Sequence, residues 1–385
     1  MAKKLQMDWL LFSVTAALAI FGVVMVYSAS AMISLRETRG ETGFFYFYKQ
    51  LIFVAVGFLL MWVGAKTDYH IFQKKLVVYV LLIITIMLLA VVYAFSPVNG
   101  ARRWIRFSGF SFQPSELSKL ALSIFLAWYF TEKSPERIKD VLSCLPVVAI
   151  LLGLVLFEPD FGTTLILTGI FIVVYFSAGA KITHLLLFAL PLIVALMAFL
   201  WFSPLRMQRV MSFLEPCSEE NSQGIGYQVC QSLYAIGSGG VFGEGFAKSQ
   251  QKLFYLPYPY SDFIFAVIGE ELGLIGTMTI VIAFAIFLWC GTRAAVGAPD
   301  RFGMLLGIGI VTGILIQALF NLSVVLSLLP AKGVTLPFLS YGGSSMVVTL
   351  FSVGILLNLS KHVGIHSIQY VNEKPFSVRR KRLRN

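Results

Sequence analysis

The chain of 385 residues consists of long, uninterrupted blocks of hydrophobic residues separated by polar segments. Each block has about 20 residues, and at a rise of about 1.5 Å per residue it spans the roughly 30 Å hydrocarbon core of a bilayer. The blocks lie at residues 8–28, 48–66, 76–95, 117–133, 140–157, 163–179, 183–203, 263–291, 303–327 and 343–361. The pattern therefore predicts an all-α polytopic membrane protein with about ten transmembrane helices.

The placement of Lys and Arg predicts the orientation of these helices. Ten crossings put both termini on one side, and the connections at 66–75 and 132–140 are short and basic, as expected of cytoplasmic loops. We therefore expect both termini to be cytoplasmic. Residues 204–262, between the seventh and eighth helices, then form a large extracytoplasmic loop. The chain divides into one membrane domain, 1–361, and a basic cytoplasmic tail, 362–385.

The long loop at 204–262 has features of its own. Its stretch at 232–246 is rich in glycine and is expected to form a short interfacial helix that ends in a glycine turn. Cys217 and Cys230 both lie in this loop, and they can form a disulfide if the loop faces an oxidising compartment. A segment of this length inside a compact fold is usually functional.

Composition supports the membrane class and narrows the possible partners. Hydrophobic residues make up 58% of the chain, charged residues 13%, and the mean hydropathy is +0.82, which is too apolar for a soluble surface. Much of the net charge of +11 lies at 379–384, where contact with anionic lipid explains it better than nucleic acid does. The sequence contains no Walker element, dinucleotide motif or zinc helix, so no organic cofactor is predicted.

The main catalytic candidate is Asp262, where the long loop enters the eighth helix. It can act as a general base or bind a divalent cation, or it can simply cap the helix N-terminus. Glu270 and Glu271 follow within the same helix, and one straight helix cannot direct all three carboxylates into one pocket. Because intramembrane acids are costly unless paired, we interpret Glu270 and Glu271 as structurally paired residues.

Cationic and polar candidates lie in the other predicted outer loops. Arg102, Arg103 and Arg106, with Trp104 between them, suit either a pyrophosphate clamp or contact with lipid headgroups. Five further candidates for substrate binding occur in three segments. They are Glu116 and Lys119 at the start of the fourth helix, Asp160 in the turn after the fifth, and Lys332 and Ser340 in the last outer loop. Glu116 and Lys119 can form an ion pair, and Asp160 can be only a turn residue.

Five motifs in order along the chain resemble those of the SEDS family (shape, elongation, division and sporulation). The motifs are RWI at 103–105, QPSELSK at 113–119, PDFGT at 159–163, DFIF with GEELG at 262–273, and PFLSYGGSS at 337–345. The resemblance covers residues 8–361. The runs RVMSFLEP at 209–216 and KGVTLP at 332–337 look like the FtsW branch rather than the RodA branch.

This resemblance implies a function and site residues. It implies a peptidoglycan glycosyltransferase that polymerises lipid II into glycan strands for septal cell-wall synthesis in a bacterial cytoplasmic membrane. The implied partners are a class B penicillin-binding protein and other membrane proteins of the divisome. The family's essential aspartate falls on Asp262, its loop tryptophan on Trp104, and its acid–lysine pair on Glu116 and Lys119. The segment before the aspartate, PYPYS at 257–261, differs from the family's usual Pro-Glu-x-His-Thr.

The mechanism predicted on this basis is a single inverting displacement. Asp262 would activate the attacking sugar hydroxyl, or hold Mg²⁺ or Mn²⁺, while the arginines stabilise the departing pyrophosphate. Two alternatives from other classes remain at this stage. A lipid II flippase would explain intramembrane Glu270 and Glu271 without a catalytic base, and a scaffold would only recruit a synthase.

Overall fold

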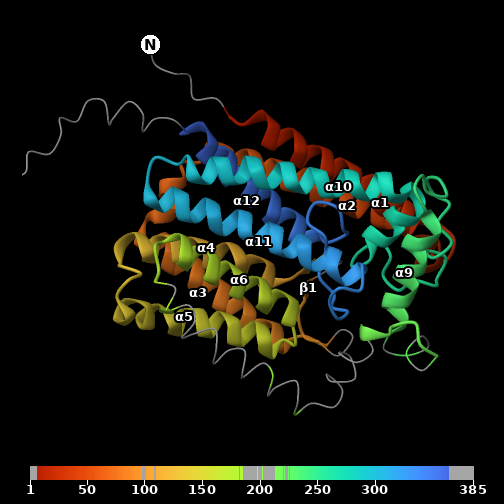
Figure 1. Cartoon of the computed structure of the whole chain (residues 1–385), viewed down its shortest axis with the longest axis horizontal. Helices are drawn as coiled ribbons and strands as arrows, with labels where there is room; N and C mark the ends of the chain where they lie inside the picture. Colours follow the sequence, from red (N-terminus) through yellow and green to blue (C-terminus); the bar gives the residue numbers. More distant parts are fainter. Residues whose placement is uncertain are drawn as a thin grey trace, which may run out of the picture.

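The computed structural model describes residues 7–97, 101–107, 110–181, 183–184, 213–219 and 226–363, together with positions 197, 202, 221 and 224. Long helices dominate these residues (Figure 1). They are α1 (Trp9–Glu37), α2 (Phe45–Lys66), α3 (Lys75–Val91), α4 (Pro114–Glu132), α5 (Ile138–Phe157), α6 (Phe161–Ser177), α9 (Tyr227–Gly239), α10 (Ile264–Val296), α11 (Arg301–Val325) and α12 (Gly343–Lys361). Two short 3₁₀ helices are η1 (Tyr69–Gln73) and η2 (Val92–Ala94).

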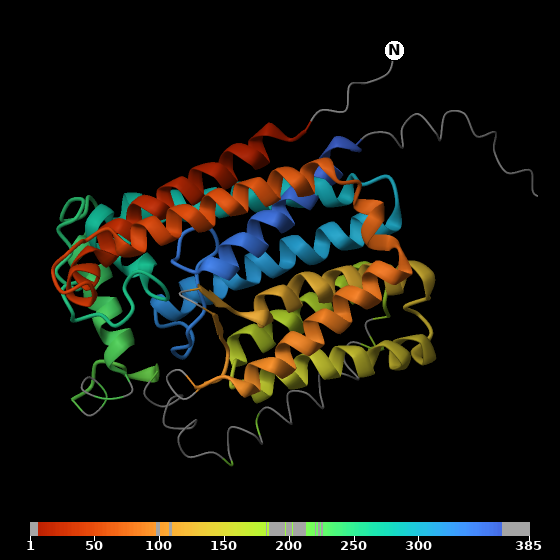
Figure 2. The same cartoon turned by 180° about the vertical axis from the view of Figure 1, so that it is seen from behind.

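The long helices run roughly side by side in a bundle (Figures 1 and 2). One part of the bundle contains α1, α2, α10 and α12, and the other contains α3, α4, α5 and α6. Helix α11 lies between them and contacts α4, α6 and α10. Its two amide side chains, Gln317 and Asn321, are buried inside the protein. The chain therefore places polar groups at its centre, although α11 is apolar enough to span a membrane.

Nine of the ten predicted helices occur among the described residues, with small shifts of their ends, and the predicted seventh helix at 183–203 lies outside them. Seven of the described helices are long and apolar enough to cross a membrane. Helix α6 has only 17 residues, and α4 carries buried Glu116 and Lys119. The chain is thus a multi-pass membrane protein, and length and composition support seven spans of the predicted ten.

The first and last described helices meet at one end of the bundle. The backbone N–H of Asp8 donates to Ser360 Oγ at 3.0 Å, and the Asp8 carboxylate pairs with Arg293. We call this the terminal end. The opposite end, which carries α9, is called the α9 end (Figure 1). The predicted basic tail lies largely outside the described residues, which end at 363.

The described residues also contain a β-hairpin, which the all-α prediction did not include. Strand β1 (Ile105–Phe107) pairs antiparallel with β2 (Phe110–Phe112), and Arg106 lies opposite Ser111. The segments IRF and FSF alternate polar and apolar residues, which is the pattern of a half-buried strand. These strands were missed because the hairpin is much shorter than the hydrophobic blocks that reveal the helices. The hairpin places the arginine cluster at the α9 end.

Helix α10 is not straight, contrary to the prediction. Gly273 interrupts it with φ 65° and ψ −160°, a conformation that only glycine adopts easily. The loop after α9 fills the break, because Leu274 N–H donates to the Gly240 carbonyl and Glu244 N–H donates to the Glu270 carbonyl, both at 2.9 Å. These bonds satisfy backbone groups that the break would otherwise leave unpaired.

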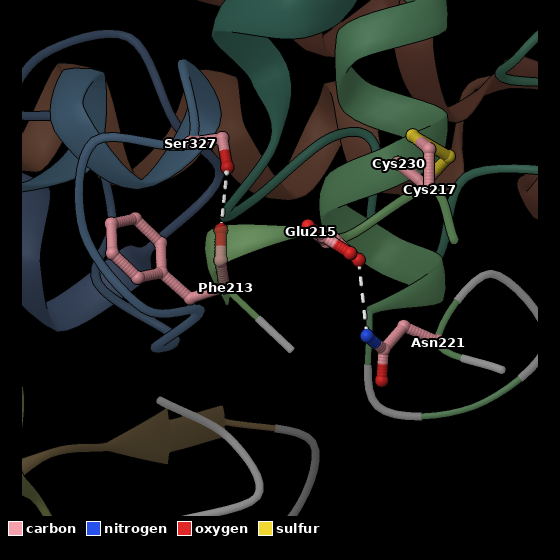
Figure 3. The surroundings of a disulfide bond; sticks show 6 residues. All are labelled: Phe213, Glu215, Cys217, Asn221, Cys230 and Ser327. Atoms are coloured by element: carbon pink, nitrogen blue, oxygen red, sulfur yellow. Dashed lines mark hydrogen bonds between the residues drawn. A yellow bond between two sulfur atoms is a disulfide. The ribbon is translucent and has the colours of Figure 1, made fainter. Parts of the chain in front are cut away.

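A short helix is present in the predicted stretch as α9, which begins earlier than expected and ends at Gly239, with Gly240 as its positive-φ C-cap. A disulfide joins Cys217 to Cys230 in this helix (Figure 3), so the structure contains the bond that the sequence left open. The segment around Cys217 is also held to the bundle, where Ser327 Oγ donates to the Phe213 carbonyl at 3.5 Å. The disulfide therefore ties this part of the long loop to α9.

Candidate active site

A cavity of about 1220 Å³ opens at the α9 end of the bundle. Its walls come from segments far apart in the sequence: the end of α1, the start of α2, the β-hairpin, the segment before α10 and the loop before α12. Asp262, Arg103, Trp104, Arg106 and Lys332 all line it. Glu116 lines it as well, so the fold brings six of the predicted site residues to one surface.

Asp262 lies two residues before α10 and is half-buried. The helix begins at Ile264 and its cap residue is Phe263, so the Asp262 side chain does not cap α10. Its Oδ1 instead accepts a hydrogen bond from Ser261 Oγ at 2.8 Å. A carboxylate with this one side-chain partner keeps lone pairs available to a ligand in the cavity.

The surroundings of Asp262 raise its pKa. Burial is the main cause and the nearby Asp160 adds to it, while the Ser261 hydroxyl and the charge of Arg103 act in the opposite direction. Gly333 approaches the same carboxylate so closely that a Cβ on residue 333 would lie 2.7 Å from Asp262 Oδ2. Glycine at 333 therefore leaves the space that this carboxylate occupies.

The backbone around Asp262 is held from two directions. Ser340 Oγ donates to the Ser261 carbonyl at 2.6 Å, and Tyr341 N–H donates to the Tyr260 carbonyl at 2.9 Å. From α11, the amide of Asn321 donates to the Asp262 carbonyl at 2.8 Å. Ser340 is buried and does not line the cavity, so the structure places it behind Asp262 rather than in contact with a ligand.

The three predicted arginines differ in their surroundings. Arg103 donates from Nε to the Glu158 carbonyl at 3.4 Å and from its guanidinium to the Pro159 carbonyl. Arg102 donates to the Tyr93 carbonyl at 2.9 Å and does not line the cavity. Arg106 does line it, from the hairpin. Two guanidinium groups thus reach the cavity wall rather than three.

Lys332 adds a further cation to this wall. Its Nζ lies 4.7 Å from the centre of the Phe161 ring, at the start of α6. Together with Arg103 and Arg106 it makes one side of the cavity positively charged, which we call the cationic wall. Such a surface suits a ligand that carries phosphate groups.

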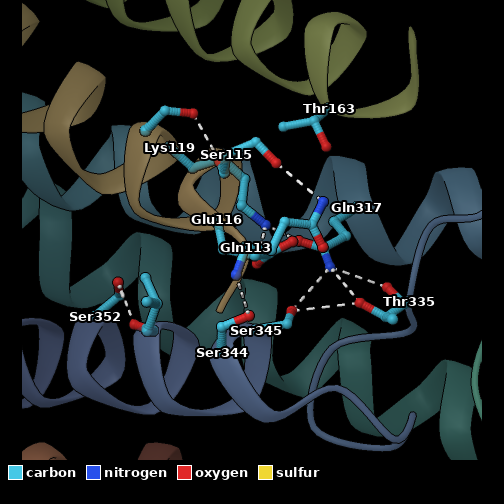
Figure 4. Close-up of polar contacts among 12 residues, drawn as sticks. Gln113, Ser115, Glu116, Lys119, Thr163, Gln317, Thr335, Ser344, Ser345 and Ser352 are labelled. Carbon is cyan, nitrogen blue, oxygen red and sulfur yellow. Dashed lines mark hydrogen bonds and ion pairs between the residues drawn. The ribbon is translucent and has the colours of Figure 1, made fainter. Parts of the chain in front are cut away.

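Glu116 and Lys119 form the predicted ion pair, with Lys119 Nζ 2.6 Å from Glu116 Oε2, and both are buried (Figure 4). Lys119 Nζ also donates to Gln317 Oε1. The Gln317 amide then donates to the Thr335 carbonyl at 2.9 Å. This network connects α4 through α11 to the loop before α12, and only Glu116 of the pair lines the large cavity.

Asp160 is buried and fully engaged in hydrogen bonds. Its carboxylate accepts from Thr163 N–H at 3.2 Å, Thr163 Oγ1 at 2.9 Å and Gln113 Nε2 at 3.1 Å. It caps α6 and ties that helix to the start of α4. Asp160 does not line the cavity, so its geometry is that of a structural turn residue.

The two intramembrane acids are paired, as predicted. Glu271 Oε1 lies 2.6 Å from Lys252 Nζ, and Ser28 Oγ donates to the same carboxylate at 2.7 Å. Glu270 accepts from Ser249 Oγ and from Gln250 N–H. Both glutamates therefore hold the segment at 249–252 against α10, and neither lines the cavity.

The described residues contain no group of three or more His, Cys, Asp or Glu side chains that could hold a metal ion. Asp262 is the carboxylate that lines the cavity beside the cationic wall. The carboxylate of the nearby Asp160 already accepts hydrogen bonds from Gln113 and Thr163. The donor set therefore does not fit a metal site built by the protein alone.

Sequence reasoning missed several residues that position the site, including Asn321, Gln317 and Ser261. The first two are polar side chains one helical turn apart in an otherwise apolar helix, which is a recognisable signal of internal hydrogen bonding. It also missed Glu158, which is fully buried next to Arg103 and has no hydrogen-bond partner for either carboxylate oxygen among the described residues. Burial and the nearby Asp160 raise the pKa of Glu158 to about 8.

The fold and the cavity define a multi-pass membrane protein in which the Asp262 carboxylate lines a cavity beside a cationic wall. Residues 8–364 match the cell cycle protein family that comprises FtsW, RodA and SpoVE. The chain belongs to this family, which confirms the resemblance to the SEDS proteins.

Individual relatives agree with this assignment. The stage V sporulation protein E of Bacillus subtilis is 39% identical over 94% of this chain and 98% of its own length. The probable peptidoglycan glycosyltransferase FtsW of Trichlorobacter lovleyi is 41% identical over 92% of this chain and 93% of its own.

Solved structures share the fold. A chain from the structure of a peptidoglycan synthase complex that coordinates polymerization and crosslinking superposes with a TM-score of 0.77 and 28% identity, covering 92% of this chain and 98% of that one. The rod shape determining protein RodA of Thermus thermophilus gives a TM-score of 0.67 with 27% identity, over 92% of this chain and 97% of RodA. Two structures that each cover 92% of this chain therefore support the architecture described above.

Proposed function

We propose that this protein joins lipid II molecules into β-1,4-linked glycan strands, with Asp262 as the general base. The chain is a peptidoglycan glycosyltransferase of the FtsW type, as its relatives are named. One observation carries the residue assignment: Asp262 is the half-buried carboxylate that lines the large cavity beside Arg103 and Lys332.

The reaction follows from this arrangement. One lipid II presents the 4-hydroxyl of its terminal sugar to Asp262, which takes the hydroxyl proton. The oxygen attacks the anomeric carbon of the growing strand, and the bond from that carbon to the lipid pyrophosphate breaks. A single displacement inverts the α-linkage to a β-linkage, as in inverting glycosidases with a sugar in place of water. General-base help of this kind contributes about 10²–10⁴-fold.

The cationic wall supports departure of the pyrophosphate. Arg103, Arg106 and Lys332 would stabilise the negative charge that develops on the leaving group. Trp104, from the same hairpin, lines the cavity beside them. Glu116 lines the cavity, and its ion pair with buried Lys119 fixes the position of its carboxylate.

We assign no step to a divalent cation, because the described residues contain no group of three or more His, Cys, Asp or Glu side chains that could hold one. If Mg²⁺ or Mn²⁺ takes part, Asp262 would be one of its protein ligands in this cavity and the substrate phosphates would provide others.

The finer topology belongs to the same proposal. We place both termini in the cytoplasm and the α9 end outside, with ten helices crossing the membrane. The disulfide between Cys217 and Cys230 supports this orientation, because such bonds persist in oxidising compartments. Transfer at the outer face then implies a class B penicillin-binding protein that cross-links the strands, acting with other divisome proteins at the septum.

Transport of lipid II is the weaker alternative. The sequence suggested transport because of the two intramembrane acids, Glu270 and Glu271. In the folded protein these acids bind Lys252, Ser28 and Ser249. No unpaired acid in the described part of α10 remains for a transport role.

The decisive experiment compares Asp262→Asn with the parent, each purified with its penicillin-binding partner and supplied with lipid II. We expect strand formation to fall at least about 100-fold. Asp140→Asn, an acid in the first turn of α5 at the terminal end, is the matched control and should polymerise normally. Undiminished synthesis by Asp262→Asn would overturn the assignment.

A further inference from the structure

Three tyrosines form a cluster that lines the cavity. The ring centres of Tyr46 and Tyr260 lie 4.4 Å apart, those of Tyr46 and Tyr341 5.0 Å, and those of Tyr260 and Tyr341 5.6 Å. They come from α2, from the segment before α10 and from the loop before α12. All three line the cavity and are half-buried. We call this cluster the aromatic wall.

The aromatic wall is fixed relative to Asp262. Tyr260 precedes it by two residues, and Tyr341 N–H donates to the Tyr260 carbonyl. Tyr341 also follows Ser340, whose hydroxyl holds the Ser261 carbonyl. The same hydrogen bonds that set the position of the carboxylate therefore set the positions of two of the rings.

Polar groups border the aromatic wall. The Tyr46 hydroxyl donates to Glu37 Oε2 at 2.7 Å, and Glu37 is exposed and lines the cavity. Lys49, one turn along α2, lines it as well. A flat apolar surface with hydrogen-bonding groups at its edge suits a pyranose ring, whose C–H face packs on aromatic rings while its hydroxyls reach the polar rim.

Asp262 lies where the aromatic wall meets the cationic wall. Arg103 is near enough for its charge to act on Asp262, and Gly333, next to Lys332, touches the carboxylate. The two reactants of a glycosyl transfer also differ in their chemistry. One must lose a pyrophosphate, which suits the cationic wall, and the other must present a sugar hydroxyl, which suits the aromatic wall.

We propose that the Tyr46–Tyr260–Tyr341 wall binds the terminal sugar ring of the attacking substrate and so presents its hydroxyl to Asp262. The departing pyrophosphate then lies on the cationic wall. This inference rests on the proposed function, since it assigns the two reactants of that reaction to the two walls.

Polymerisation kinetics provide the first test. Tyr341→Leu removes one ring and should raise the lipid II concentration needed for half-maximal rate about 10-fold, with a much smaller change in the maximal rate. Tyr341→Phe keeps the ring and should restore most of that affinity. Tyr255→Leu, an exposed tyrosine outside the cavity, is the matched control and should behave like the parent.

A binding measurement separates this inference from the proposed function. The probe is the lipid-free disaccharide of lipid II, observed by saturation-transfer NMR with the Asp262→Asn protein in detergent. Saturation should reach the C–H protons of the terminal sugar and should be lost in the Asp262→Asn/Tyr341→Leu protein, but not with Tyr341→Phe.

The outcomes are distinct. If the parent polymerises lipid II while Tyr341→Leu leaves both the half-saturating concentration and the saturation transfer unchanged, the aromatic wall has no role and the proposed function stands. If the parent fails to polymerise, the proposed function fails, and the NMR result still decides whether the wall binds a sugar. A monodisperse Tyr341→Phe protein without saturation transfer would also overturn the inference.

Discussion

The hydroxyl of Ser340 donates to the backbone carbonyl of Ser261 at 2.6 Å, and it links the loop before α12 to the residue that precedes Asp262. The same hydroxyl accepts from Leu336 N–H at 2.8 Å, so it is fully used inside the protein. The position of Asp262 therefore depends on a loop that lies about 80 residues further along the chain.

Ser340→Ala should disturb Asp262 without removing any group from the cavity. The change leaves the buried Ser261 carbonyl and the Leu336 N–H without their partner, at a cost of about 1–3 kcal/mol. We expect the maximal rate of polymerisation to fall about 10-fold, with little change in the half-saturating lipid II concentration. Ser352→Ala is the control, because Ser352 bonds only within its own helix. Equal rates for both variants would show that the Ser340 bond does not position Asp262.

The pH dependence of polymerisation should reflect the raised pKa of Asp262. A general base works in its deprotonated form, so activity should rise with pH through a pKa above the ordinary value of 3.8. The charge of Arg103 lowers this pKa, and Arg103→Gln should therefore move the acidic limb to higher pH. The quantity to measure is the ratio of the maximal rate to the half-saturating lipid II concentration, determined over a range of pH. A limb that moves to lower pH in Arg103→Gln would contradict the electrostatic role.

Glu158 should make the folded protein less stable as the pH rises. Its pKa is about 8 in the folded state against 4.5 in the unfolded state, so the folded protein binds an extra proton between these values. The stabilisation is complete below about pH 4.5 and is lost as the pH rises towards 8. Thermal unfolding in detergent should show the loss, and Glu158→Gln should reduce it. The exposed Glu136→Gln serves as the control, and an unchanged pH profile in Glu158→Gln would disprove the assignment.

Lys252→Met should destabilise the protein strongly. The substitution leaves Glu271, which is fully buried, as an unpaired carboxylate, and breaking a buried pair in this way costs about 3–5 kcal/mol. Adding Glu271→Gln should recover most of the loss, because the amide oxygen still accepts from Ala247 N–H. The free energy of unfolding of the two single variants and the double variant gives the coupling directly. Additive effects would mean that the two charges do not interact.

The sequence predicted much of the helical frame and several residues that line the cavity. Hydrophobic block length located nine helices because the match between helix length and bilayer thickness is a local property. The same blocks did not reveal the break at Gly273, which is stable only because Gly240 and Glu244 supply partners to the interrupted backbone. They also gave no sign of the short hairpin that carries Arg106.

The predicted site residues fall into two groups, those that line the cavity and those that only support it. Asp262, Arg103 and Lys332 reach one cavity, whereas Asp160, Ser340 and Arg102 are used to hold the structure beside it. Both groups contain polar residues in outer loops, and the sequence could not distinguish them. The structural residues are distinguished by hydrogen bonds to distant parts of the chain. Gln113 bonds to Asp160 and Ser340 bonds to Ser261, and the two residues of each pair are 45 or more positions apart.

By itself, the sequence determined that this chain is a helical membrane protein of the SEDS family with an acid, Asp262, directly before its eighth predicted helix. These properties depend on residue type and local spacing. Only the tertiary structure decided that Asp262 lies between a cationic and an aromatic wall, and that the acids of α10 face Lys252 and Ser249 instead. The reason is physical: the direction of a side chain follows from its own helix or loop, but its surroundings follow from how distant segments pack.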